Sequence, residues 1–152
     1  MKSFQTGYSA IQLIVTIAII GILLGVVSVP FLKFRQQQAL ENTTDGLVSV
    51  LGEARAKTLA GYDNTSYGVH IEAAQFVLFT GTTYNANAST NKTFFYETGV
   101  SLGTLTLNGS GSNISFDRLK GTTSQYGTIV LQSQNGQTRT ITITSTGTVK
   151  RN

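Results

Sequence analysis

Apolar residues follow three successive patterns along this chain. From Leu13 to Leu32 they form an almost unbroken run, and about 20 apolar helical residues are enough to cross a ~30 Å hydrocarbon core. After Lys33 apolar positions recur at three- and four-residue steps, which indicates an amphipathic helix. The small and apolar residues of that stripe are Leu40, Leu47, Leu51, Ala54 and Thr58. From Tyr67 onward the period changes to two, which is typical of strands.

The first two patterns predict one long helix from about Tyr8 to Ala60, apolar on all sides in its first half. Pro30 lies inside it and is expected to kink it, because proline removes a backbone donor and crowds the preceding turn. Gly61 is the expected helix stop.

The alternating pattern predicts a series of strands at Tyr67–Ile71, Gln75–Thr80, Lys92–Thr98, Thr104–Leu107, Asn113–Phe116, Gly127–Gln132 and Arg139–Thr144. Asn135 and Gly136 predict a hairpin turn, since both residue types tolerate positive φ. We therefore expect an α+β fold, in which a long N-terminal helix, transmembrane in its first half, packs on a small antiparallel β-sheet.

The composition adds little evidence for a charged partner. Only 12% of the residues are charged and cysteine is absent, so disulfides and thiolate chemistry are excluded. The formal net charge is +4. Lys2 and Lys33 flank the apolar run, and without them the chain has 9 of its 11 basic residues and 7 acidic residues. A net charge of +2 is a weak signal for nucleic-acid binding.

The residues before the apolar run are unusual for an export signal. The leader from Met1 to Gly7 places its small residue before the apolar run, whereas a secretory peptide is cleaved after it. Cleavage after Gly7 would leave the apolar helix attached to the mature protein.

This arrangement resembles the signal of type IV pilins and type II secretion pseudopilins. The resemblance implies that a membrane aspartic peptidase cuts after Gly7 and that the new N-terminus at Tyr8 is methylated, with Tyr in place of the usual Phe. The residues that carry the match are Gly7, Tyr8, Ile11, Leu13, the run Ile17–Leu23 and Pro30, which falls where pilins commonly have a helix-disrupting proline.

The remainder is similar to the GspH/FimT group of minor pilins and pseudopilins. The matching segments are Leu51–Ala60, Ile114–Phe116, Gly127–Leu131, Arg139–Ile143 and Gly147–Val149. The resemblance implies a leader (1–7), a transmembrane helix (8–33), an amphipathic helix (34–60) and a GspH-like β-domain (61–152).

The family implies a structural role, as a subunit of a type II secretion pseudopilus or a type IV pilus. The expected partners are other pilin or pseudopilin subunits, the prepilin peptidase and the inner-membrane assembly platform. The expected location is the inner membrane, with a single span and the C-terminal domain outside the cytoplasm, and then the filament.

Gln12 departs from the family pattern, in which the fifth mature residue is nearly always Glu. In the family, that carboxylate is thought to pair with the N-terminal amine of a neighbouring subunit. The attraction within such a pair is about 4 kcal/mol at an effective dielectric near 20, before the cost of desolvation. A neutral hydrogen bond contributes about 1 kcal/mol. We hypothesise a minor or tip-proximal subunit; the alternative is that a hydrogen bond suffices.

Other interpretations stay open. An ordinary secretory peptide, with Val26 and Ser28 before a cut at Val29, would release a soluble β-domain, and an uncut signal anchor is a related alternative. A DNA-uptake pilin is another, with Arg139, Lys150 and Arg151 as phosphate contacts. The basic motif of such pilins begins Gly-Arg, but here Gly147 is followed by Thr148.

No pattern of catalytic or metal-ligating residues stands out. His70 lies in an expected strand with no motif around it, where a lone histidine is more often structural or exposed. Neither a phosphate-binding loop nor metal-ligand spacing is evident. We expect no enzyme, no cofactor and no metal. Packing in the core or sheets is the default expectation for the tyrosines Tyr62, Tyr67, Tyr84, Tyr96 and Tyr126.

Overall fold

The chain forms an α+β structure with one long helix and two antiparallel sheets. A computed structural model describes residues 9–152, apart from the side chains of residues 25–31. The helical elements are α1 (Ala10–Leu59) and the short 3-10 helix η1 (Tyr62–Asn64). The strands are β1 (Tyr67–Ile71), β2 (Gln75–Thr80), β3 (Lys92–Phe95), β4 (Val100–Leu107), β5 (Asn113–Ser115), β6 (Gly127–Ser133), β7 (Thr138–Ile143) and β8 (Val149–Arg151).

Helix α1 ends where the sequence predicts. Gly61 has left-handed dihedrals (φ 64°, ψ 27°), a conformation that favours glycine and stops helices. The helix is continuous through Pro30, whose side chain is outside the description, so the predicted kink stays a prediction. Among the described residues, no helix combines the length and the apolar character needed to cross a membrane.

The chain divides into two units, Met1–Arg35 and Gln36–Asn152. In the second unit the strands form one sheet in the order β3-β2-β1-β5 and another in the order β4-β6-β7-β8, with every described pair antiparallel. The expectation of a single small sheet is therefore wrong. Alternation along a strand indicates which side chains are buried, but it does not indicate which strands pair.

Several strands differ from their predicted extent: β3 ends at Phe95 instead of Thr98, and β5, β6 and β7 differ by one residue at one or both ends. β4 begins at Val100 instead of Thr104, because its register shifts between Leu102 and Thr104 and the intervening Gly103 interrupts the alternating pattern. β8 was not predicted, since three residues are too short to show a period of two; it is defined only by its pairing with β7.

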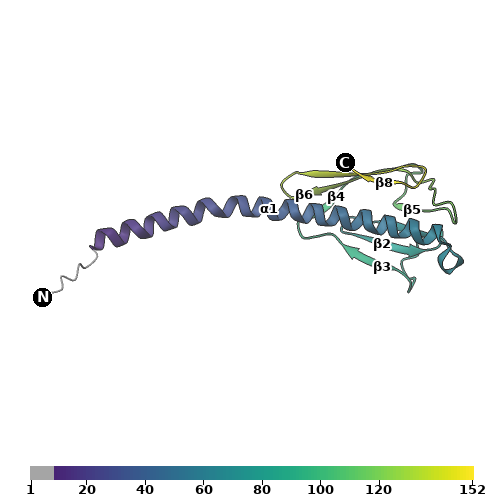
Figure 1. Cartoon of the computed structure of the whole chain (residues 1–152), viewed down its shortest axis with the longest axis horizontal. Helices are drawn as coiled ribbons and strands as arrows, with labels where there is room; N and C mark the ends of the chain where they lie inside the picture. The colour runs from purple at the N-terminus through teal and green to yellow at the C-terminus, as the bar shows by residue number, and fades with distance from the viewer. Residues whose placement is uncertain (1–8) are drawn as a thin grey trace. The chain divides into compact units, whose positions relative to one another are not determined.

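The core of the second unit is built around one face of α1. Figure 1 shows the C-terminal half of the helix with strands of one sheet on one side and strands of the other sheet on the opposite side. Its predicted stripe is buried, with Leu40, Leu47, Leu51 and Ala54 each at 0% exposure. The same cluster includes side chains from both sheets, among them Val69, Ile71, Ile114, Ile129, Leu131 and Ile141.

Two buried threonines attach the helix to the sheets. Thr58 donates its hydroxyl hydrogen to the Ala54 carbonyl (2.8 Å) and accepts a hydrogen bond from the backbone N–H of Tyr67 at the start of β1 (2.9 Å). Thr43 accepts a hydrogen bond from the N–H of Glu97, in the connection between β3 and β4 (3.1 Å). These bonds satisfy backbone donors that have no partner in the sheet ladders, of which that of Tyr67 is buried.

The outer face of the first sheet carries a buried aromatic residue. Phe79 is 1% exposed and lies opposite Gly68 in the ladder between β1 and β2. A Cβ atom built on Gly68 would come within 2.5 Å of the Phe79 ring and 2.6 Å of the Ile114 carbonyl oxygen. Only glycine leaves room for this ring to lie across the strand.

We predict that Gly68→Ala lowers the free energy of unfolding by about 2–3 kcal/mol, since overpacking costs about 1–3 kcal/mol and the backbone contact cannot relax freely. The matched control is Gly52→Ala in α1, where a Cβ atom meets nothing within 4 Å. It should be stabilising by about 0.5–1 kcal/mol. Urea unfolding of the full chain, followed by circular dichroism, measures both, and equal stabilities of the two variants would contradict the packing described.

Candidate functional site

The most unusual surface of the molecule is the first part of α1. From residue 11 to residue 23, nine large apolar side chains are each at least 50% exposed: Ile11, Leu13, Ile14, Val15, Ile17, Ile19, Ile20, Ile22 and Leu23. Soluble monomers rarely expose a contiguous apolar patch of more than a few hundred Å². This segment, residues 11–23, is therefore a candidate surface for burial in lipid or against other helices.

The residues expected to direct processing and assembly lie in and around this segment. Gly7 and Tyr8 lie outside the described residues. Gln12 is exposed in the first turns of α1, and its carbonyl accepts a hydrogen bond from the Thr16 hydroxyl (2.8 Å). The Gln12 side chain is therefore presented on the surface of the apolar segment, where a neighbouring group can contact it.

The three basic residues expected to contact DNA lie close together on β7 and β8. Two of them already have acidic partners on α1. Arg139 donates from Nε to Glu41 Oε1 (2.8 Å), and its Nη2 is 2.5 Å from the same oxygen. Arg151 Nη1 lies 3.0 Å from Glu41 Oε2 and 2.6 Å from Asp45 Oδ1. Lys150, between them in the chain, is exposed.

This arrangement changes the interpretation of the basic residues. Two carboxylates offset most of the charge of the three cations, and the paired guanidinium groups have used donors that a phosphate would need. The ion pairs instead join the edge strand β8 to the helix. We call the group of Glu41, Asp45, Arg139 and Arg151 the ion-pair cluster.

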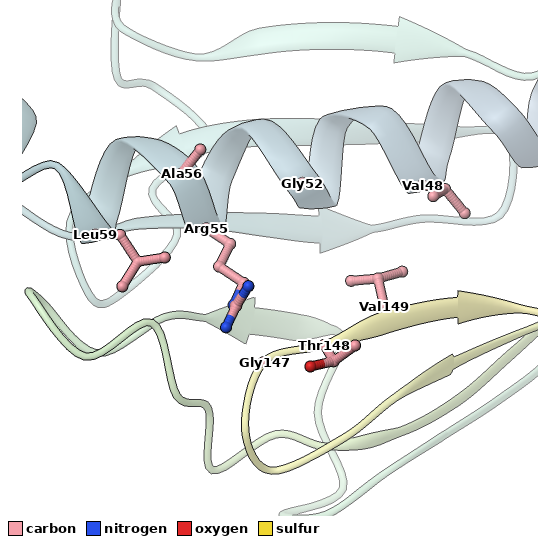
Figure 2. Close-up of a pocket in the computed structure, with 8 residues that line it drawn as sticks. All are labelled: Val48, Gly52, Arg55, Ala56, Leu59, Gly147, Thr148 and Val149. Atoms are coloured by element: carbon pink, nitrogen blue, oxygen red, sulfur yellow. The ribbon is translucent and has the colours of Figure 1, made fainter.

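A second helix-to-sheet connection lies in a groove of about 290 Å³ between α1 and the β7–β8 turn (Figure 2). There Arg55 extends from the helix toward the turn and donates to the carbonyls of Gly121 (3.1 Å) and Thr146 (3.2 Å). Gly147 has φ 75°, and a Cβ atom on it would lie 1.9 Å from the Gly121 oxygen. Gly147 therefore forms the turn before β8.

Sequence reasoning missed a polar cluster on the outer face of the first sheet. The His70 ring stacks on Tyr84 (centroids 4.0 Å apart, planes at 11°). His70 Nδ1 is 2.6 Å from Asn113 Oδ1, and Nε2 is 3.4 Å from Glu72 Oε1. Glu72 also accepts a hydrogen bond from Gln75 (2.6 Å). The cluster fastens the β2–β3 loop, which carries Tyr84, to the sheet.

The same region changes the acidity of two tyrosines. Burial, followed by the charge of Glu72, raises the pKa of Tyr96 to about 12, and the Tyr96 hydroxyl donates to the Glu72 carbonyl (2.9 Å). Burial and then Glu72 also raise the pKa of Tyr84. Both phenols therefore stay neutral hydrogen-bond donors at physiological pH. Within residues 9–152, no three His, Asp or Glu side chains form a group that could hold a metal ion.

Comparison with models of known protein families, with curated proteins and with solved structures found no match to this chain.

We predict that Glu41→Gln lowers the free energy of unfolding by about 1 kcal/mol, because one partly buried carboxylate pairs with the partly buried Arg139 and with the exposed Arg151. The loss should shrink in molar salt, which screens the ion pairs. The matched control is Glu53→Gln, which among the described residues pairs with Lys57 one turn along the helix (2.6 Å), a contribution of about 0.5 kcal/mol or less. Urea unfolding at low and high salt compares them, and equal losses would contradict the linking role of Glu41.

Proposed function

We propose that this chain is a prepilin-like subunit of a membrane-anchored filament, a minor pilin or pseudopilin of a type IV pilus or a type II secretion pseudopilus. The observation that carries the proposal is the apolar segment of α1, whose nine large side chains are half or more exposed. Full burial of one such side chain contributes about 1.5–3 kcal/mol. Burial of all nine would contribute on the order of 10 kcal/mol, which favours lipid or neighbouring helices over water.

The sequence around this segment supports the same proposal. The apolar run continues in sequence to Leu32 and includes residues 25–31, whose side chains are outside the description. In the proposed mechanism, α1 holds the subunit in the inner membrane until an assembly machine extracts it. The same apolar surface then packs among the helices of other subunits.

The second unit would be carried on the outside of the membrane and of the filament. Its helix stripe is already covered by the two sheets, so it needs no other subunit to bury its core. Its exposed surface has few charges, since only 12% of all residues are charged. Such a domain can decorate a filament while α1 provides the attachment.

The position of Gln12 within α1 supports a minor or tip-proximal place in the filament. A glutamine at this exposed site offers a neighbouring N-terminal amine only a neutral hydrogen bond of about 1 kcal/mol. A carboxylate would offer an ion pair as well. A subunit at the tip has no subunit above it to provide that amine. Glutamine in place of glutamate therefore costs such a subunit no ion pair.

We predict that the mature chain, purified from the membranes of a host with a prepilin peptidase, begins at Tyr8 and carries one N-methyl group. Intact mass spectrometry measures this. Gly7→Leu should leave the chain uncut, because a larger side chain replaces the small residue at the cleavage site, while the control Gly21→Ala should be processed normally. A mature N-terminus at Val29 would indicate a secretory signal peptide and would contradict the proposal, as would an uncut wild-type chain.

We also predict that Gln12→Glu raises the number of copies incorporated per filament, because the added carboxylate allows pairing with a neighbouring amine. The neutral control is Gln12→Asn. Quantitative immunoblotting of sheared filaments measures incorporation. If Gln12→Glu and the wild type are incorporated equally, the tip-proximal placement is wrong.

A further inference from the structure

A cavity of about 350 Å³ lies beside the C-terminal end of α1. It is bordered by the last turn of the helix, by η1, by β1 and β2, and by the loop that leads into β3. Its volume is near the lower end of the range for small-molecule sites, about 300–1,000 Å³. The cavity is separate from the apolar segment of α1 and from the groove in Figure 2.

Two tyrosine rings form one side of this cavity. Tyr62 is 55% exposed, although tyrosine is expected to pack, and Tyr67 beneath it is 6% exposed. Their centroids are 6.2 Å apart, with the planes at 48°. Lys57 Nζ lies 5.8 Å and 5.4 Å from the two ring centroids. The exposed Tyr62 ring therefore provides a flat, partly apolar surface at the cavity.

The backbone places an acid beside these rings. Asp63 and Asn64 both have left-handed φ values, 49° and 56°. Asp and Asn tolerate this conformation better than other residues with side chains, and residues held in it are enriched at ligand sites. The Tyr67 hydroxyl donates to Asp63 Oδ2 (3.1 Å), which fixes the carboxylate at the cavity wall.

An unsatisfied acceptor borders the cavity from the loop side. Asn91 lines the cavity, and its Oδ1 is buried with no hydrogen-bond partner among the residues the structure describes. Its Nδ2 donates to the Asn85 carbonyl (2.8 Å), so the orientation of the amide is set. A buried acceptor without a partner costs about 1–3 kcal/mol. Because this oxygen is closed to solvent, a ligand in the cavity would bond instead to the exposed polar groups of the lining, among them Asp63 and Lys92.

The charges around the cavity are close to balanced. Lys57 is paired with Glu53 at 2.6 Å, and Lys92 and Asp63, which also border the cavity, have opposite signs. A phosphate or other anion would need an excess of cations. The lining instead combines donors and acceptors, and a hydroxyl group can use both because it donates one hydrogen and accepts at two lone pairs.

We propose that this cavity is a saccharide-binding site that takes one ring of a neutral glycan. The ring stacks on Tyr62, and its hydroxyl groups bond to Asp63 and to a lysine ammonium group. The His70–Tyr84 stack supports the site, because it fastens the loop that leads to Asn91. This site does not depend on the apolar segment and adds recognition to the proposed filament subunit.

Saturation-transfer NMR and calorimetry on the full chain test the proposal, in a detergent without a sugar headgroup. The probes are four disaccharides at millimolar concentration: maltose, cellobiose, lactose and N,N′-diacetylchitobiose. At least one should bind. Tyr62→Ala should weaken it about tenfold, since loss of an aromatic contact costs up to about 1.5 kcal/mol. The control Tyr126→Ala, which removes another exposed tyrosine outside the cavity, should bind as the wild type does.

A second variant distinguishes a specific site from nonspecific binding of sugar to an exposed aromatic ring. Asp63→Asn tolerates the left-handed turn but removes the carboxylate, and it should also weaken binding, with an unfolding curve that shows the variant is folded. The proposal is overturned if none of the four sugars binds, or if Tyr62→Ala and Tyr126→Ala bind equally. It is also overturned if inorganic phosphate displaces the sugar, because this would indicate an anion site.

Discussion

The whole second unit depends on the burial of one stripe of α1 between two sheets. Each four-stranded sheet has an apolar face that must be covered, and the helix covers both. Leu40, Leu47 and Leu51 therefore belong to a core that both sheets share. This core includes side chains from strands of different sheets, which do not pair with each other. Loss of this stripe would leave two separate sheets with exposed apolar faces.

The attachments around that core explain why the polar residues lie where they do. Thr58 and Thr43 connect the helix to the first sheet and to the connection between the sheets. Arg55 and the ion-pair cluster connect it to the turn before β8 and to β8 itself. Three charged groups of the helix, Glu41, Asp45 and Arg55, thus hold the helix to the rest of the domain. This favours a structural interpretation of Arg139 and Arg151 over DNA contact.

Much of this fold could be read from the sequence because local patterns determine it. The apolar stripe predicted the buried helix face, and Gly61 predicted its end. The features that were not predicted depend on long-range pairing. The two-sheet arrangement and β8 are defined by partner strands, and Glu41 lies 98 residues from Arg139 and 110 from Arg151. The turn at Gly136 was placed correctly, but among its two central residues only the glycine has a positive φ.

The two candidate sites also differ in whether the sequence alone could predict them. The apolar segment was predictable, since a run of apolar residues needs no tertiary context to be recognised. The saccharide cavity was not, because Tyr62 and Asn91 come together only after the left-handed turn at Asp63 and the folding of the β2–β3 loop. No local spacing of these residues would reveal their shared cavity.

The central claim is that the apolar segment of α1 is embedded in the membrane while the second unit lies outside it. Because the chain has no cysteine, single substitutions report accessibility without background. Ile17→Cys lies in the apolar segment, and Thr83→Cys lies at an exposed position of the second unit. A charged, membrane-impermeant maleimide should label Thr83→Cys in intact spheroplasts, and Ile17→Cys only after the membrane is dissolved in detergent. Equal labelling of both variants before detergent is added would contradict the account.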